Sequence, residues 1–72
     1  MAGVGVDTAS LDTGASTDFI VHKTLLSHGV YGIENINNRL GELPARGTTL
    51  FVMPMKIGGG SGAPCRVCAL IP

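Results

Sequence analysis

Short apolar segments alternate with polar, glycine-containing segments along the chain, which predicts strands and a helix joined by loops. Four apolar runs are short and contain β-branched residues, as strands do; they span residues 2–6, 30–34, 48–54 and 65–71. The glycine-rich stretch GGGSG, between the last two runs, predicts a loop because glycine is costly in regular structure. The order of elements predicts an α/β fold with one main helix and three or four strands. We find no internal repeat and nothing that marks a second domain.

The segment between the first two predicted strands should form the helix, over residues 18–28. Its apolar residues recur with approximately helical spacing; they are Ile20, Val21, Leu25 and Leu26. Gly29 suits the C-terminal cap, and His28 lies in the last turn. Three polar residues could cap the N-terminus of the helix: Ser16, Thr17 and Asp18.

These elements predict a small hydrophobic core. We expect it to contain Leu25, Leu26, Val30, Ile33, Leu50, Val52 and Val67. In a well-packed core, replacing Leu26 by Ala would lower the free energy of unfolding by about 2–5 kcal/mol. The chain has only 72 residues and no Trp, and a domain of this size buries only about 60% of its unfolded surface. We therefore expect the isolated chain to be marginally stable or to form a homo-oligomer.

Composition narrows the possible functions. At 44% hydrophobic and 14% charged residues, the chain is too apolar to be disordered. Five basic residues balance five acidic ones and are scattered, so we expect no binding to nucleic acid or to an anionic membrane. The apolar runs are far too short for a membrane span. The first ten residues do not resemble a secretory signal, so we expect a cytoplasmic protein with reduced cysteines.

The glycine run and the two cysteines resemble functional motifs, but we favour a structural interpretation of both. The glycine run lacks the Lys and Ser/Thr that follow a phosphate-binding loop, so a hairpin-like connection is expected, with a loop closing over a small ligand as the alternative. Cys65 and Cys68 form a C-x-x-C sequence, but residues three apart in a strand point to opposite faces. Zinc sites of this type need a second pair of ligands, which the chain lacks. We interpret both cysteines as small hydrophobic residues of a strand.

The candidate ligands are His22, before an apolar run, and Glu34, after the next one. On these two residues alone, surface positions are the simpler interpretation, because a metal usually takes three or more protein ligands. The only other histidine is His28. Asp7, Asp12 and Asp18 could contribute carboxylates, but no spacing requires any of them.

Several segments in this order resemble the C-terminal part of the metal-dependent cyclase-like hydrolases, which include kynurenine formamidases and isatin hydrolases. The resemblance extends from about Gly3 to Leu70. Its most specific segments are Gly5-Val6-Asp7-Thr8, Asp18-Phe19 to His22, Glu34-Asn35, Leu43-Pro44 and the GGSGAPCR run.

The resemblance implies a fold, a reaction and a site. The fold would be part of a swivelling β/β/α domain, and the reaction the hydrolysis of a formamide, amide or lactam C–N bond in a small molecule. In the formamidase branch, the residues matching His22 and Glu34 complete a metal position. Imidazole and carboxylate suit zinc or manganese, which activates water for attack on a carbonyl. The resemblance therefore implies that His22 and Glu34 are metal ligands.

The chain also departs from the family. Its relatives build most of the metal centre on a His-x-Gly-Thr-His-x-Asp-x-Pro-x-His motif, which these 72 residues do not contain. We therefore expect residues 1–72 to be the C-terminal portion of a hydrolase domain, or a short paralogue, inactive alone and with weak or no metal binding. No residue is assigned a catalytic role. The alternative is a non-catalytic interaction or dimerisation module, paired with itself or with a full-length relative. A small ligand-binding domain of unrelated purpose fits the resemblance poorly.

Overall fold

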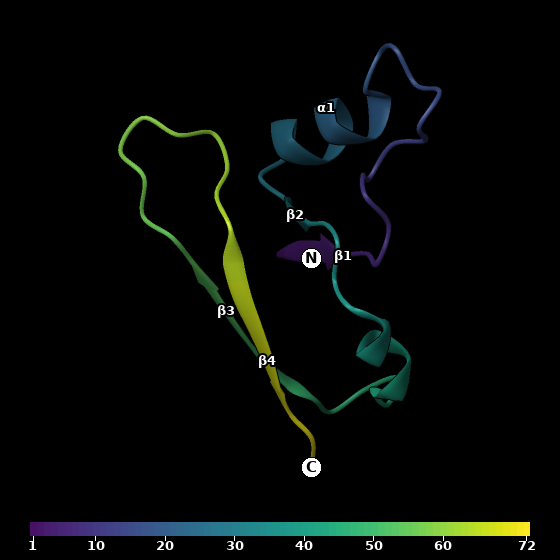
Figure 1. Cartoon of the computed structure of the whole chain (residues 1–72), viewed down its shortest axis with the longest axis vertical. Helices are drawn as coiled ribbons and strands as arrows, with labels where there is room; N and C mark the ends of the chain where they lie inside the picture. Colours follow the sequence, from purple (N-terminus) through teal and green to yellow (C-terminus); the bar gives the residue numbers. More distant parts are fainter. The chain divides into compact units, whose positions relative to one another are not determined.

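The computed structural model describes all 72 residues, and its elements follow the predicted order (Figure 1). They are strand β1 (Gly3–Gly5), helix α1 (Ile20–Ser27), strand β2 (Tyr31–Ile33), the 3-10 helix η1 (Asn38–Glu42), strand β3 (Thr49–Pro54) and strand β4 (Cys65–Leu70). The predicted α/β class, with one main helix and four strands, is confirmed. The observed strands and helix start or end slightly inside the predicted limits. No helix has the length and apolar character needed to cross a membrane.

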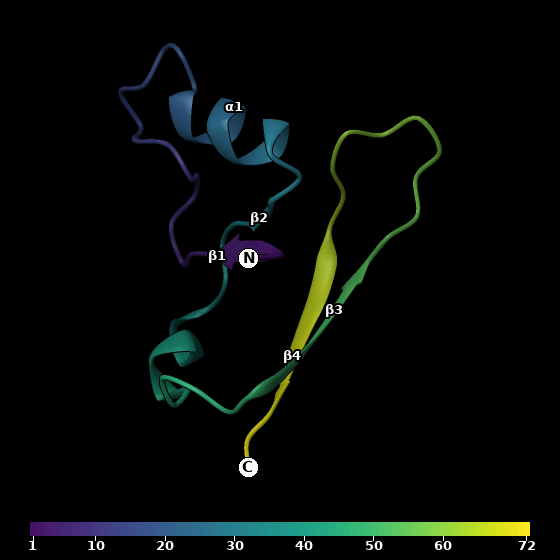
Figure 2. The same ribbon diagram turned by 180° about the vertical axis from the view of Figure 1, so that it is seen from behind.

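The chain divides into two compact units, Met1–Gly41 and Glu42–Pro72. In the first unit, β1 and β2 pair in parallel, with Gly3 opposite Tyr31 and Gly5 opposite Ile33. Parallel neighbours require a crossover connection, which α1 and its flanking loops provide. Helix α1 packs against β2, as both ribbon views show (Figures 1 and 2). The first unit is therefore a small βαβ arrangement.

The second unit is an antiparallel hairpin of β3 and β4. The register runs from Thr49 opposite Leu70 to Pro54 opposite Cys65. Beyond the last pair, the N–H of Met55 donates a hydrogen bond to the carbonyl of Pro64 at 2.9 Å. The glycine-rich stretch closes the hairpin, which confirms its interpretation as a connection.

Of the seven predicted core residues, two are exposed and the other five are only partly buried. Leu26 is 55% exposed and Leu50 52% exposed, and no hydrophobic residue of the chain is fully buried. The reason is that one short helix covers one face of a two-stranded sheet, while the hairpin has no covering layer within its unit. A Leu26→Ala cost of several kcal/mol therefore does not apply, since exposed positions usually change stability by less than about 0.5 kcal/mol.

The two ends of α1 compare differently with the sequence prediction. At the C-terminus, Gly29 adopts φ 73°, as a C-terminal cap should, and its N–H bonds to the carbonyl of Leu26 at 3.1 Å. At the N-terminus the predicted caps are wrong. The capping position is Phe19, in a left-handed conformation with φ 51° and with no hydrogen bond from its side chain to the helix. Ser16 Oγ accepts the N–H of Phe19 itself at 3.2 Å and not an N–H inside the helix. The first N–H groups inside the helix are bound by Asp12 instead.

We expect Gly29→Ala to lower the free energy of unfolding by about 1–2 kcal/mol, because an L-residue is strained in the left-handed conformation. Gly14→Ala is the matched control. An added Cβ there meets nothing within 4 Å, and its backbone is not left-handed, so the change should stay within about 0.5 kcal/mol. Urea unfolding followed by circular dichroism measures both. Equal effects of the two substitutions would contradict the assignment of Gly29 as the helix cap.

Candidate metal site

Three polar side chains from separate segments meet in the first unit. His22 lies in the first turn of α1, Glu34 directly follows β2, and Asp12 lies in the loop between β1 and α1. The imidazole Nδ1 of His22 is 2.6 Å from Oδ2 of Asp12, and its Nε2 is 3.0 Å from Oε2 of Glu34. The structure thus brings together the two predicted ligands and adds a third residue behind them.

Asp12 is held by the start of the helix. Its Oδ1 accepts the N–H of Val21 at 2.8 Å, and its Oδ2 accepts the N–H of His22 at 3.1 Å. The first N–H groups of a helix have no partner inside it, and their partial positive charge favours a carboxylate. Asp12 is 7% exposed and is the one buried polar residue of the chain. It therefore caps α1 from a position nine residues before Val21.

Glu34 is held from the other side by the loop that contains Asp12. Its Oε2 accepts the N–H of Leu11 at 3.0 Å. The Leu11 side chain occupies the space above Gly32 of β2, where an added Cβ would lie 2.4 Å from Leu11 Cδ1. The next residue after Glu34, Asn35, has φ 59° and donates its N–H to the carbonyl of Thr8 at 2.8 Å. These contacts fix the end of β2 against the loop and direct the Glu34 carboxylate toward His22.

The two carboxylates stabilise the charged form of the imidazole between them. The hydrogen bond to Asp12 raises the pKa of His22 above 6.5; desolvation opposes this shift, and the negative charge of Glu34 adds to it. For Asp12, burial raises the pKa, but the hydrogen bonds from the His22 side chain and from the N–H groups of Val21 and His22 outweigh it. The pKa of Asp12 therefore lies below its ordinary value of 3.8.

These shifts predict how the stability of the first unit depends on pH in the absence of metal. The lowered pKa of Asp12 gives stability that is present above pH 3.8 and is lost as the pH falls through the folded-state pKa. The raised pKa of His22 gives stability that is present below pH 6.5 and is lost as the pH rises through the folded-state pKa. We therefore expect greatest stability between these two values, measured as the urea midpoint of the helix signal in the presence of a chelator.

The His22→Gln variant should lose the decline on the alkaline side. His28→Gln is the control, because His28 bonds only within its own helical turn, through Nδ1 to the carbonyl of Thr24 at 2.6 Å and to Ser27 Oγ at 3.3 Å. An alkaline decline that survives in His22→Gln and disappears in His28→Gln would show that the wrong histidine has been assigned.

The spacing of His22 and Glu34 fits a shared cation. A neutral imidazole has one N–H, so donation from Nδ1 to Asp12 leaves Nε2 as an acceptor facing the Glu34 carboxylate. Two acceptors 3.0 Å apart repel unless a second proton or a cation lies between them. Two ligand atoms on one zinc ion, each at about 2.0–2.2 Å, lie about 2.8–3.1 Å apart at a right angle and about 3.3–3.6 Å apart at the tetrahedral angle. The donor pair therefore suits a divalent metal as well as a proton.

The chain itself offers only this pair of candidate ligands. No group of three or more His, Cys, Asp or Glu side chains in the chain is arranged to hold a metal. Asp12 directs its Oδ2 at Nδ1, on the far side of the ring from Glu34. Of the other two carboxylates considered from the sequence, Asp18 accepts the Ser16 hydroxyl at 3.1 Å, and Asp7 is exposed.

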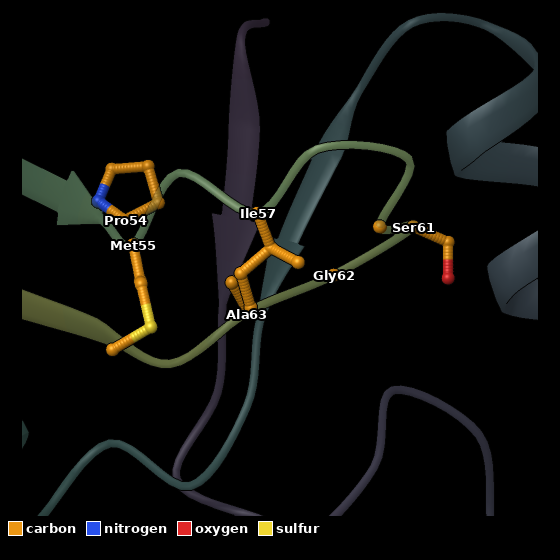
Figure 3. A pocket seen from close by; sticks show the side chains of 7 residues that line it. Pro54, Met55, Ile57, Ser61, Gly62 and Ala63 are labelled. Carbon is orange, nitrogen blue, oxygen red and sulfur yellow. The ribbon is translucent and has the colours of Figure 1, made fainter.

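The remaining sequence motifs lie in the hairpin of the second unit. Cys65 and Cys68 are both free and lie in β4, opposite Pro54 and Phe51, which agrees with their interpretation as strand residues. The glycine-rich loop surrounds a small hollow of about 180 Å³. Figure 3 shows Ile57 and Ala63 directed at each other across it, while the hydroxyl of Ser61 points away. The hollow offers no charged group that could bind or activate a ligand.

Comparison with known proteins finds relatives over nearly the whole chain. The isatin hydrolase of Roseibium aggregatum is 35% identical over 69 residues, which are 96% of this chain and 26% of that protein. Kynurenine formamidases of Salinibacter ruber and Polaromonas naphthalenivorans are 38% and 33% identical over 63 residues, which are 88% of this chain and 29% and 27% of those proteins. No family model matches the chain. The chain thus spans between a quarter and a third of the length of these curated relatives, and the resemblance indicated by its sequence is confirmed.

Proposed function

We propose, from the relation to kynurenine formamidases and isatin hydrolase, that the chain is part of a metal-dependent hydrolase acting on a formamide, amide or lactam C–N bond. Its contribution would be two ligands, His22 and Glu34, to a zinc or manganese ion. The observation that carries this proposal is the 3.0 Å approach of His22 Nε2 to Glu34 Oε2, made by residues at the start of a helix and at the end of the following strand. The substrate would be a small-molecule amide.

A bound zinc or manganese ion would supply a Lewis acid that polarises the substrate carbonyl and makes water acidic. His22 would bind the ion through Nε2, and Glu34 would add a negative charge that favours a divalent cation. A catalytic zinc normally takes three protein ligands and keeps one position for water. We propose that residues outside these 72, matching the histidine-rich motif of the family, supply the other ligands. The chain alone should then bind metal weakly and show no hydrolysis.

We also propose that the two units form part of a swivelling β/β/α domain. The support is the βαβ unit, which carries both ligands, and the hairpin, whose apolar faces are not covered within its own unit. In this proposal the rest of the domain covers the hairpin on both faces.

Titration of zinc or manganese into the 72-residue chain tests the ligand assignment. We expect weak binding by the wild-type chain and no measurable binding by Glu34→Gln, because the substitution removes the charge but keeps the size of the side chain. Asp18→Asn is the matched control: it removes one exposed carboxylate of the same unit, so its affinity should stay within about twofold of wild type. Tight, stoichiometric binding that Glu34→Gln does not change would show that the ligands are elsewhere.

The second candidate function is a non-catalytic interaction or dimerisation module derived from the same family. The hairpin favours it, because large apolar side chains are exposed on both of its faces, such as Phe51 (51% exposed) and Leu50. Such a module would pair with a second copy of this chain or with a full-length relative.

A further inference from the structure

The carboxylate of Asp12 makes one contact that its role as a helix cap does not require. Capping α1 uses the N–H groups of Val21 and His22, at 2.8 and 3.1 Å. The contact from Oδ2 to the imidazole Nδ1 of His22 is shorter than either, at 2.6 Å. Burying a carboxylate is costly unless its oxygens are hydrogen-bonded, and the imidazole provides one of these bonds. The Asp12 side chain is only 3% exposed, so no water-facing alternative replaces it.

We infer that Asp12 is a positioning residue, which holds the Nδ1–H of His22 and thereby presents Nε2 to Glu34 and to the metal they would share. The inference rests on the proposed function, since the metal is part of that proposal. A histidine that binds a metal commonly donates its other ring N–H to a carboxylate, which fixes the tautomer and the ring orientation. Here one carboxylate fixes both the helix end and the ring that the helix carries.

The competition between the two carboxylates decides which nitrogen carries the proton of the neutral ring. Asp12 is closer, at 2.6 Å against 3.0 Å for Glu34. It is also buried, whereas the Glu34 side chain is 31% exposed and can bind water instead. A buried acceptor without a donor costs more than an exposed one, so the proton belongs on Nδ1. Phe19 adds a steric constraint, with its ring edge-on to the imidazole at 6.0 Å between centroids.

Asp12→Asn changes the group that holds the ring while keeping the size of the side chain. Oδ2 of Asp12 accepts the backbone N–H of His22 at 3.1 Å and also contacts Nδ1, so neither orientation of an amide satisfies every donor. With the amide oxygen toward Val21, the NH₂ group meets the N–H of His22 and donates to Nδ1, which moves the ring proton to Nε2. With the oxygen toward His22, the NH₂ group meets the N–H of Val21, and the neutral oxygen holds the Nδ1–H less strongly than a carboxylate does. In both orientations the variant weakens the preference for a proton on Nδ1 and for Nε2 as the metal ligand.

The test combines the tautomer of His22 with metal binding by the 72-residue chain. Nitrogen-15 NMR of the imidazole, at a pH at which the ring is neutral and with a chelator present, should show the proton on Nδ1 in wild type and a larger share of it on Nε2 in Asp12→Asn. Zinc chloride titrations should show about 10–100-fold weaker binding by Asp12→Asn, the usual cost of losing an outer partner of a ligand. Asp18→Asn should match wild type in both measurements.

A proton on Nε2 in wild-type chain would overturn the inference, and so would a zinc affinity of folded Asp12→Asn within twofold of wild type. Circular dichroism reports whether the variant keeps its helix; where it does not, the wild-type tautomer alone decides. Failure of the wild-type chain to bind zinc would contradict the weak binding expected of His22 and Glu34 without the other ligands of the proposed site. It would leave the positioning of the ring by Asp12 to be decided by the tautomer.

Discussion

Replacing His22 by Ala should abolish metal binding and the proposed hydrolysis together, in an enzyme that contains this chain and the remaining ligands. The imidazole is the only group that faces both carboxylates, with Nδ1 2.6 Å from Asp12 and Nε2 3.0 Å from Glu34. Its loss removes a ligand and leaves two carboxylates without the donor between them. We expect activity to fall by more than about 100-fold, which exceeds the usual cost of removing an outer partner of a ligand.

The measurements are bound metal per chain, by elemental analysis, and the rate of amide hydrolysis. His28→Ala is the matched control, because it removes the other histidine, at the opposite end of the same helix, and should change neither value by more than about twofold. A His22→Ala enzyme that keeps its metal and its rate would show that the ligand has been assigned to the wrong residue. Robust turnover by the wild-type 72 residues alone would instead contradict the need for ligands from outside the chain.

The elements of the fold were predictable because their signals are local. The short β-branched runs, the glycine loop and the left-handed Gly29 each determine the structure of a few neighbouring residues. The core was not predictable in the same way. Whether Leu26 or Leu50 is buried depends on how many layers cover each face, and two small sheets with one helix leave both exposed.

In the candidate site, too, the sequence could not predict the contacts that depend on tertiary structure. His22 and Glu34 were proposed from a resemblance, since two residues twelve positions apart do not by themselves specify a metal site. Asp12 was only one of three carboxylates that could contribute, because its contacts depend on the path of a loop. One signal could have distinguished it. The first turn of α1 contains no acidic residue and has no cap from its own side chains, so its free N–H groups require an acceptor from elsewhere.

The second large effect concerns the hairpin: we expect the isolated chain to sediment as an oligomer. A two-stranded ribbon is marginally stable alone and needs a further layer. The register places Phe51 with Cys68 on one face, and Leu50 with Ala69 on the other, so both faces are apolar. Phe51→Asp or Leu50→Asp should shift sedimentation toward monomer, because association would bury the new charge. Ser61→Asp, in the exposed loop, is the control and should leave the oligomer unchanged.

The two substitutions also separate the two proposed functions, since they alter opposite faces of one hairpin. As part of a complete hydrolase domain, the hairpin would be covered on both faces, so Phe51→Asp and Leu50→Asp should each prevent the chain from assembling with the rest of that domain. A dimerisation module that pairs through one face would be sensitive to only one of them. Co-purification of each variant with the remaining part of the domain tests the first outcome, and sedimentation of each variant tests the second. A wild-type chain that is monomeric and unfolds cooperatively at high temperature would contradict the expected oligomer and the dimerisation module, because its apolar hairpin faces would then be stable in water.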